Sequence, residues 1–200
     1  MAIYLVRHGE TSGNRDRVLQ TPFTELTEMG HQQARELAQG LSETSITKIV
    51  CSDYTRTQQT AAPLHSAQQC ELVLEPLLQE RSFGDIRGKS YDEVEEDFFH
   101  IDYAPPNGET FGQFTQRVAQ AWQCVIDMAA NTQGNLLVMT HGLVLRELVS
   151  THLHIKPNIQ AHSDFHNTCV TVVDSGDLKS VGKLCDISHL SDKIRLGGAV

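Results

Sequence analysis

The chain has 200 residues, of which 40% are hydrophobic and 20% charged, a composition typical of one globular domain with a sizeable core. We therefore expect residues 1–200 to form a single domain. A formal net charge of -9 disfavours non-specific attraction to nucleic acid or anionic lipid. No apolar run approaches the ~20 residues of a membrane span, and no secretory signal follows Met1, so we expect a cytoplasmic protein with no membrane partner.

Short apolar runs alternate with helical patterns along the chain, which is typical of an α/β fold. Helical periodicity is clearest in residues 27–41, where Thr27 can cap the first turn, and in residues 111–128. We expect an α/β/α arrangement of three layers around a mainly parallel central sheet. The predicted strands are 2–6, 47–51, 71–74, 135–140 and 168–173, with a further hairpin strand after the turn Ser175-Gly176.

Residues 75–102 are strongly acidic and supply -6 of the net charge. We interpret this stretch as the solvated flank of a helix rather than as a binding surface. The spacing of Ser90 and Glu93 predicts a capping box at a helix start. The five cysteines are odd in number and form no C-x-x-C pair, which predicts buried, reduced thiols rather than disulfides or a zinc site.

Basic residues follow three of the predicted strands. Arg7 and His8 come directly after the first strand, and His141 comes directly after strand 135–140. Strand 47–51 leads into the segment Ser52-Asp53-Tyr54-Thr55-Arg56. If these strands are parallel, the four side chains meet at one carboxyl edge of the sheet, where open α/β folds place their ligands. Arginine binds phosphate oxygens through paired, charge-assisted hydrogen bonds, and a neutral imidazole can attack phosphorus, so this pattern favours phosphohistidine chemistry.

Glycines follow both histidines of this group. We expect glycine at positions 9 and 142 because the backbone approaches a ligand closely there and leaves no room for a side chain.

Six motifs in order resemble the histidine phosphatase superfamily, the phosphoglycerate mutase-like proteins, and together they cover nearly the whole chain. The resemblance implies that family's fold. The motifs are Arg7-His8-Gly9-Glu10-Thr11 with Asn14, Leu26-Thr27-Glu28-Met29-Gly30 with Gln33-Ala34, Cys51-Ser52-Asp53 with Arg56 and Thr60-Ala61, Glu80 with Phe83-Gly84 and Gly88, Asn107-Gly108-Glu109-Thr110, and Thr140-His141-Gly142 with Leu145-Arg146.

The resemblance also implies a role for each site residue. His8 is the expected nucleophile and Glu80 the expected general acid and base. The remaining candidates are expected to bind the phosphoryl oxygens of a small phosphorylated substrate, without a metal or other cofactor; these are Arg7, Asn14, Arg56 and His141. A general acid must keep its proton near neutral pH, so we expect a raised pKa for Glu80.

Two positions depart from the family pattern. Val18 stands where relatives carry a basic residue, with Arg17 one place early, and Glu25 replaces a proline. These departures fall on the side of the pocket that contacts the leaving group. The spacing of His152, His154, His162 and His166 could hold a metal, but we favour solvent-facing or supporting roles for these four histidines.

Three other functions are compatible with parts of the pattern. A cysteine-dependent phosphatase needs five residues between its cysteine and arginine, whereas only four separate Cys51 from Arg56. A non-catalytic phosphate-binding module would need no general acid, so the candidate acid Glu80 argues against this function. A cofactor-dependent phosphoglycerate mutase would use the same residues, but the 61-residue interval from Glu80 to His141 is compact beside the longer insertion of the mutases, so we favour a phosphatase.

Overall fold

The computed structural model describes the chain except residues 158, 160–163, 175, 178 and 196–200. Its sheet has the order β3-β2-β4-β1-β6-β7-β5. The strands are β1 (Ile3–Arg7), β2 (Ile46–Cys51), β3 (Glu71–Leu74), β4 (Asn135–Thr140), β5 (His154–Ile155), β6 (Val170–Val173) and β7 (Ser180–Asp186). Strands β3, β2, β4 and β1 are parallel, while β6 is antiparallel to both β1 and β7.

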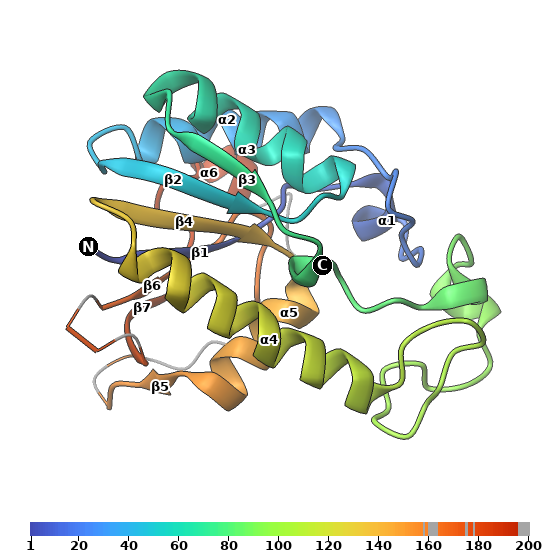
Figure 1. The fold of residues 1–200 in the computed structure, drawn as a ribbon. Helices are drawn as coiled ribbons and strands as arrows, with labels where there is room; N and C mark the ends of the chain where they lie inside the picture. Colours follow the sequence, from blue (N-terminus) through green and yellow to red (C-terminus); the bar gives the residue numbers. More distant parts are fainter. Residues whose placement is uncertain (158, 160–163, 175, 178, 196–200) are drawn as a thin grey trace.

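Helices cover both faces of the sheet, as Figure 1 shows. Helices α2 and α3 lie on one face, and α4 and α5 lie on the other. The helices are α1 (Ser12–Arg15), α2 (Glu28–Gly40), α3 (Thr55–Gln68), α4 (Phe111–Ala130), α5 (Gly142–Glu147) and α6 (Asp192–Arg195), with short 3₁₀ turns at Pro76–Leu78, Gly84–Ile86 and Tyr91–Glu93 and a π turn at Leu148–His152. The predicted three-layer α/β fold with a mainly parallel sheet is confirmed.

Each face of the sheet has its own apolar core. The core under α4 and α5 includes Leu5, Val118 and Leu145, and the core under α2 and α3 includes Leu37 and Ile49. Strand β4 lies in the middle of the sheet and is buried over Leu136–Thr140, as expected for a parallel strand covered on both faces. This packing fixes the strand ends that carry the candidate site.

The predicted helix starts and strand ends agree closely with the structure. The Thr27 hydroxyl accepts a hydrogen bond from the amide of Gly30, which caps α2. The predicted strand 168–173 corresponds to β6, which begins two residues later than expected, at Val170. Thr168 has a φ of 58° and cannot extend the strand. Strand β7 forms the predicted hairpin with β6, although Ser175 of the predicted turn lies outside the described residues.

The acidic stretch 75–102 is not the flank of a helix. It consists of 3₁₀ turns and loops that fold over a small core of Leu19, Phe83, Ile86 and Phe98. The Glu93 carboxylate accepts a hydrogen bond from the Ser90 amide, but only one 3₁₀ turn follows. Apolar residues do not recur at helical spacing there, so nothing extends that turn.

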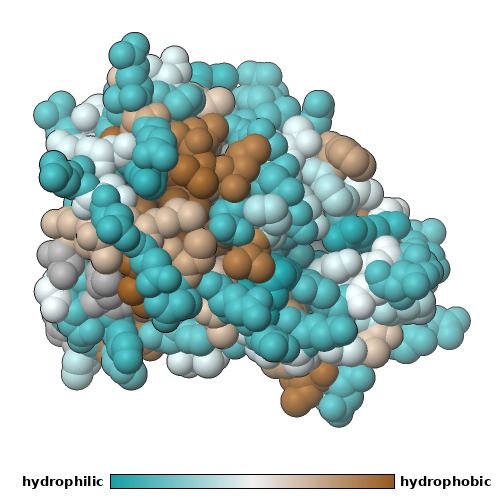
Figure 2. All heavy atoms as spheres, viewed as in Figure 1, coloured by the Kyte–Doolittle hydropathy of each residue, from teal (hydrophilic) through white to brown (hydrophobic). Residues whose placement is uncertain are grey.

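The remaining sequence predictions concern the cysteines and the surface. All five cysteines are free; four are buried, and Cys124 is half-buried. Of the helices in the described part of the chain, none is long and apolar enough to span a membrane. Figure 2 shows a mostly hydrophilic face on which apolar side chains gather over the β3 edge of the sheet, where Leu72 and Leu74 are exposed.

Candidate active site

The carboxyl ends of β1, β2 and β4 bring together the basic residues that the sequence singled out. Arg7 is the last residue of β1 and His8 follows it, Arg56 lies in the first turn of α3 after β2, and His141 directly follows β4. The rings of His8 and His141 have centroids 5.2 Å apart. The side chains of Arg7, His8, Arg56 and Glu80 line one pocket of about 260 Å³.

The His8 ring is held in one tautomer. Its Nδ1 lies 2.7 Å from the carbonyl oxygen of Gly9, which can only accept, so Nδ1 carries the proton and Nε2 carries a lone pair. Asn167 donates to the His8 carbonyl at 2.9 Å, and the Gly9 amide donates to Thr60 Oγ1 at 2.9 Å. Burial and the charges of Arg56 and Arg7 lower the pKa of His8 well below its ordinary value, so the imidazole is neutral at pH 7.

Arg56 is buried and Arg7 is half-buried, and each has a hydrogen-bonding nitrogen without a partner in the described part of the chain. Arg7 donates to the carbonyl of Phe165, and Arg56 donates to the carbonyl of Thr21 at 3.0 Å. The Nε atoms of both arginines are buried without a partner among the described residues. Burial lowers the pKa of Arg56 to about 10, which still leaves it protonated at pH 7. Because an unpaired buried donor costs about 1–3 kcal/mol, an oxyanion bound here would be stabilised.

His141 also has an unused buried nitrogen. Its Nε2 lies 2.9 Å from Ser52 Oγ, and that hydroxyl accepts from the Tyr54 amide at 3.4 Å, so its proton is available for Nε2. Nδ1 of His141 is buried without a partner among the described residues, and it carries the ring proton in the tautomer in which the Ser52 hydroxyl donates to Nε2. Burial, followed by the charge of Arg56, lowers the pKa of His141, so the ring is neutral at pH 7.

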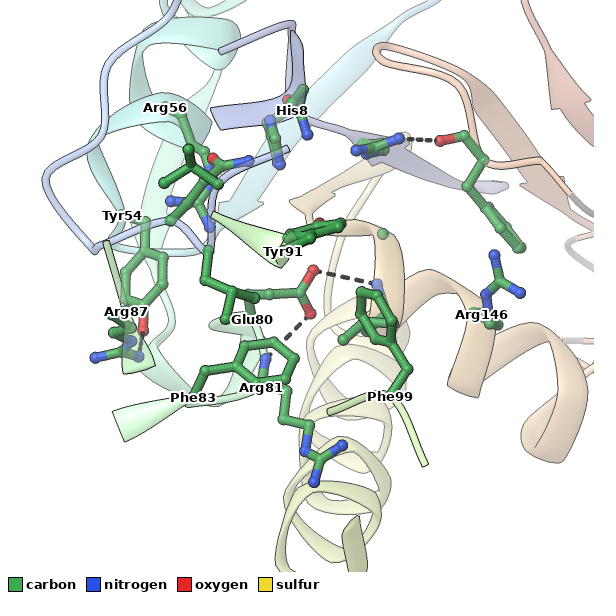
Figure 3. Close-up of a pocket in the computed structure, with 18 of the residues that line it drawn as sticks. His8, Tyr54, Arg56, Glu80, Arg81, Phe83, Arg87, Tyr91, Phe99 and Arg146 are labelled. Carbon is green, nitrogen blue, oxygen red and sulfur yellow. Dashed lines mark hydrogen bonds between the residues drawn. The ribbon is translucent and has the colours of Figure 1, made fainter. Parts of the chain in front are cut away.

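The Glu80 carboxyl is partly buried beside these cations (Figure 3). Its Oε1 accepts from the Arg81 amide at 3.1 Å, and its Oε2 accepts from the Leu143 amide at 3.2 Å. Burial raises the pKa of Glu80 and outweighs both hydrogen bonds and the charges of Arg56 and Arg7, which lower it. The direction agrees with the expectation for a general acid.

The Glu80 loop is held by a half-buried ion pair between Arg117 and Glu109. Arg117 on α4 donates to both carboxylate oxygens of Glu109 at 2.7 Å, and also to the carbonyls of Leu77, Gln79 and Glu80. The Ser82 amide also donates to the Glu109 carboxylate, at 2.8 Å. One guanidinium thus binds the backbone up to and including the catalytic candidate, and its partner Glu109 binds the backbone beyond it.

Asn14 lies in the pocket wall, with its carbonyl oxygen occupied. Oδ1 of Asn14 accepts from the Thr11 amide at 3.2 Å, from the Thr11 hydroxyl at 3.0 Å and from Asn167 Nδ2 at 3.3 Å. Only the amide nitrogen of Asn14 is left to donate to a ligand.

The structure corrects the expectation for Gly9. A Cβ on Gly9 would lie 2.7 Å from the carbonyl oxygen of Gly30, so the absent side chain lets the loop pack against α2 rather than against a ligand. A Cβ on Gly142 would lie 3.4 Å from Arg7 Nε, an ordinary van der Waals contact, so the expectation for Gly142 stays a prediction.

Several lining residues carried no signal in the sequence. Asn167 and Phe165 reach the site from the segment before β6, more than 150 residues beyond His8, and no motif marked them. On the leaving-group side, Val18 lines the pocket as expected, while the guanidinium of Arg17 lies 5.1 Å above the Tyr91 ring. Further lining residues are Tyr54, Arg87, Tyr91, Phe99 and Arg146.

The other histidines do not form a group with metal-binding geometry within the described residues. His152 is half-buried, His154 is exposed on β5, and His166 lies at the pocket wall. His162 lies outside the described residues. No cluster of three or more His, Cys, Asp or Glu side chains suited to a metal ion occurs in the part of the chain that the structure describes.

An α/β sheet with an arginine-lined pocket at its carboxyl edge defines the class of protein, and comparison with known proteins gives the family. Residues 3–184 match the model of the histidine phosphatase superfamily (branch 1). A probable phosphoglycerate mutase GpmB from Erwinia tasmaniensis is 33% identical over an alignment of 208 positions, gaps included, which covers 96% of each chain. This chain belongs to the histidine phosphatase superfamily, branch 1.

Solved structures share the fold. YhfR from Bacillus stearothermophilus superposes with a TM-score of 0.78 at 30% identity, covering 95% of this chain and 99% of that one. A protein from Escherichia coli K-12, provisionally named an alpha-ribazole-5'-P phosphatase, superposes with a TM-score of 0.72 at 26% identity, covering 88% of this chain and 91% of that one. Similar proteins thus carry the names of mutases and of phosphatases.

Proposed function

We propose that this protein is a phosphatase that hydrolyses phosphomonoesters through a phosphohistidine on His8. The observation that carries the proposal is the unprotonated Nε2 of His8, which shares a pocket with two arginines whose buried Nε atoms have no partner among the described residues. A neutral imidazole is a ready nucleophile, and the arginines offset the negative charge of the phosphoryl oxygens. Arg7, Arg56 and His141 bind these oxygens, and Asn14 adds a neutral donor.

The reaction runs in two steps. The lone pair of His8 Nε2 forms a bond to phosphorus as the bond to the leaving oxygen breaks, and Glu80 gives that oxygen its proton. A water molecule then attacks the phosphohistidine, and the Glu80 carboxylate takes the proton of the water as the N–P bond breaks. The products are the alcohol and inorganic phosphate, and both residues return to their first state.

The first prediction tests the intermediate. Brief reaction with a ³²P-labelled phosphomonoester and an alkaline quench should leave label on His8, because phosphohistidine survives base and is lost in acid. Peptide mapping by mass spectrometry locates the label. His8→Ala should carry none, and His100→Ala, which changes an exposed histidine, should label like the wild type. An acid-stable label, or one retained in His8→Ala, would contradict the proposal.

The second prediction concerns metals. Since Arg7, Arg56 and a donor on His141 supply the charge stabilisation that a metal would otherwise provide, activity should change less than about twofold in excess EDTA. The measurement is the initial rate of phosphate release before and after chelation. A large loss that added Mg²⁺ or Zn²⁺ restores would show that the proposed charge balance is incomplete.

A second candidate function is phosphoglycerate mutase activity, which the name of the Erwinia tasmaniensis relative favours. A mutase returns the phosphoryl group of His8 to a second hydroxyl instead of to water. The 61 residues from Glu80 to His141 are the observation against it. Incubation with 3-phosphoglycerate separates the two functions, because a phosphatase releases phosphate whereas a mutase forms the 2-phospho isomer.

A further inference from the structure

The pocket continues beyond the phosphoryl-binding residues into a half with mainly apolar walls. On the side of Glu80 away from His8, aromatic and aliphatic side chains line the pocket together with Arg81 and Arg87. We call this part the apolar half; its walls are Val18, Leu19, Phe83, Tyr91, Phe99 and Leu143. Val18 is the position where the family pattern carries a basic residue, and the neighbouring Arg17 places its guanidinium 5.1 Å above the Tyr91 ring instead.

Three aromatic rings surround the carboxyl group of Glu80 in Figure 3, namely those of Phe83, Tyr91 and Phe99. The ring of Phe99 packs edge-on against Tyr91, at a centroid distance of 5.7 Å, and against Phe83, at 6.1 Å. It also rests on the buried ring of Phe98 at 4.4 Å. Despite these contacts Phe99 remains 45% exposed. A fixed ring that stays exposed at a pocket wall is suited to contact with a ligand.

The arginines of this region do not surround Glu80. The guanidinium of Arg81 lies 5.4 Å above the Phe83 ring and donates to the carbonyls of Glu109 and Tyr103. Arg87 donates to the Tyr54 hydroxyl at 3.0 Å, and Arg87 and Arg146 lie toward opposite sides in Figure 3. The leaving oxygen must lie beside Glu80 to receive its proton. The group attached to that oxygen therefore lies next to the rings of Phe83, Tyr91 and Phe99.

We propose that the apolar half binds the leaving group, and that the substrates are phosphomonoesters of aromatic or other bulky apolar alcohols rather than small anionic ones such as phosphoglycerate. This inference rests on the proposed function and adds its substrate class. Phe99 supplies the ring face that the leaving group covers. Contact between two aromatic groups adds to the free energy of apolar burial, so recognition does not depend on a second anionic group of the substrate.

The test compares substrates that differ in the leaving group but not in the chemistry of its oxygen. 2-Phenylethyl phosphate and glycerol 3-phosphate are both primary alkyl phosphates, and 3-phosphoglycerate adds a carboxylate. Wild-type kcat/KM should be about tenfold or more higher for 2-phenylethyl phosphate than for either of the other two, given the usual worth of burying a ring. Phe99→Ala should lower the 2-phenylethyl phosphate value about 3- to 10-fold, several times more than it lowers the glycerol 3-phosphate value.

Ile101→Ala is the matched control, because Ile101 lies in the same loop, is 62% exposed and does not line the pocket. It should keep the wild-type ratio of the two substrates. A preference for either small polar substrate, or equal losses on both substrates in Phe99→Ala, would overturn the proposal.

Binding separates this inference from the proposed function. His8→Ala removes the nucleophile but keeps the apolar half, so calorimetric titration with the same esters measures affinity without turnover. Tighter binding of 2-phenylethyl phosphate supports the substrate class even if the wild type forms no phosphohistidine. Equal affinities for the three esters, or tighter binding of a small polar one, would reject it.

Discussion

Burial changes the pKa values of His8 and Glu80 in opposite directions, and each direction suits the proposed role. His8 loses affinity for a proton because its charged form would be desolvated beside Arg56 and Arg7. Glu80 gains affinity because its charged form is also desolvated, and nearby cations compensate only in part. A neutral nucleophile and a protonated acid therefore coexist over a wider pH range than their ordinary pKa values allow.

The third prediction separates the acid from the nucleophile. Glu80→Gln keeps the shape of the side chain but removes the transferable proton, so hydrolysis of glycerol 3-phosphate should fall about 10²–10⁴-fold. Hydrolysis of p-nitrophenyl phosphate should fall distinctly less, because its phenolate leaves without a proton. The wild-type rate falls as pH rises through the raised pKa of Glu80, and this basic limb of the kcat/KM profile should be lost in the variant.

Asp85→Asn is the control for that experiment, because Asp85 is an exposed carboxylate on the same loop and accepts from Asn107. It should keep the basic limb and the wild-type ratio of the two substrates. Equal losses on both substrates in Glu80→Gln would assign the acid to another group.

The sequence predicts these site residues because parallel strands place their carboxyl ends at one edge. That rule brings Arg7, His8, Arg56 and His141 together without any knowledge of distances. It says nothing of Asn167, which reaches His8 only because β6 runs antiparallel beside β1. It also misassigns Gly9, whose close neighbour is the backbone of α2, since packing between elements distant in sequence leaves no local pattern.

At the scale of elements, helix α4 positions the acid from outside the pocket. Arg117 bonds three carbonyls of the segment 77–80 and both oxygens of Glu109. Although burial raises the pKa of Glu109, the hydrogen bonds from Arg117 and Ser82 outweigh it and keep the carboxyl charged. The planar guanidinium makes all these bonds at once, which a lysine ammonium cannot do.

The fourth prediction concerns Arg117 as a positioning residue. Arg117→Lys keeps the charge beside Glu109 but loosens the Glu80 loop, so kcat on glycerol 3-phosphate should fall about 10- to 100-fold, as for other small misplacements of a catalytic group. The loss on p-nitrophenyl phosphate should be smaller, and the basic limb of the pH profile should shift.

Gln116→Ala, at an exposed position on the same helix, is the control and should match the wild type in both rates. If Arg117→Lys changes only thermal stability, or raises KM alone, Arg117 does not act through Glu80.

The segment 75–102 shows where prediction of elements fails. Its acidic residues suggest a solvated helix, yet it crosses the pocket mouth as turns, joined to the loop after α1 by bonds such as Leu19 N to Lys89 O at 2.9 Å. Long-range pairing and the burial of Phe98 and Phe83 hold it there. Elsewhere in the chain, apolar residues repeat with the period of a helix or a strand, so those elements can be predicted locally. The conformation of segment 75–102 instead depends on contacts with residues distant in sequence.

Over the whole molecule, the charge of the site is opposite to the charge of the chain. The net charge is -9, but Arg56 is a buried cation, Arg7 is a half-buried one, and Glu80 beside them has a raised pKa. The charges of these arginines lower the pKa values of the buried His8 and His141, which would add further positive charge if protonated. Folding therefore favours the uncharged forms of both histidines, which links the stability of the molecule to pH.

The fifth prediction follows from that linkage. Both histidines have folded-state pKa values well below 6.5, so below about pH 6.5 the unfolded chain binds more protons than the native chain, and the free energy of unfolding falls as the pH falls. The stabilisation is complete above the unfolded value and is lost progressively below it. Each proton taken up only on unfolding lowers the free energy by at most about 1.4 kcal/mol per pH unit. Urea unfolding monitored by circular dichroism at intervals between pH 7.5 and 5 measures the slope.

His141→Gln removes one of the two groups and should make the slope between pH 6.5 and 5 shallower, whatever its effect on stability at pH 7.5. The comparison uses slopes because the substitution also alters the hydrogen bond to Ser52. His100→Gln, at an exposed position, should retain the wild-type slope. A slope unchanged in His141→Gln would show that folding does not lower the pKa of this histidine, contrary to the prediction.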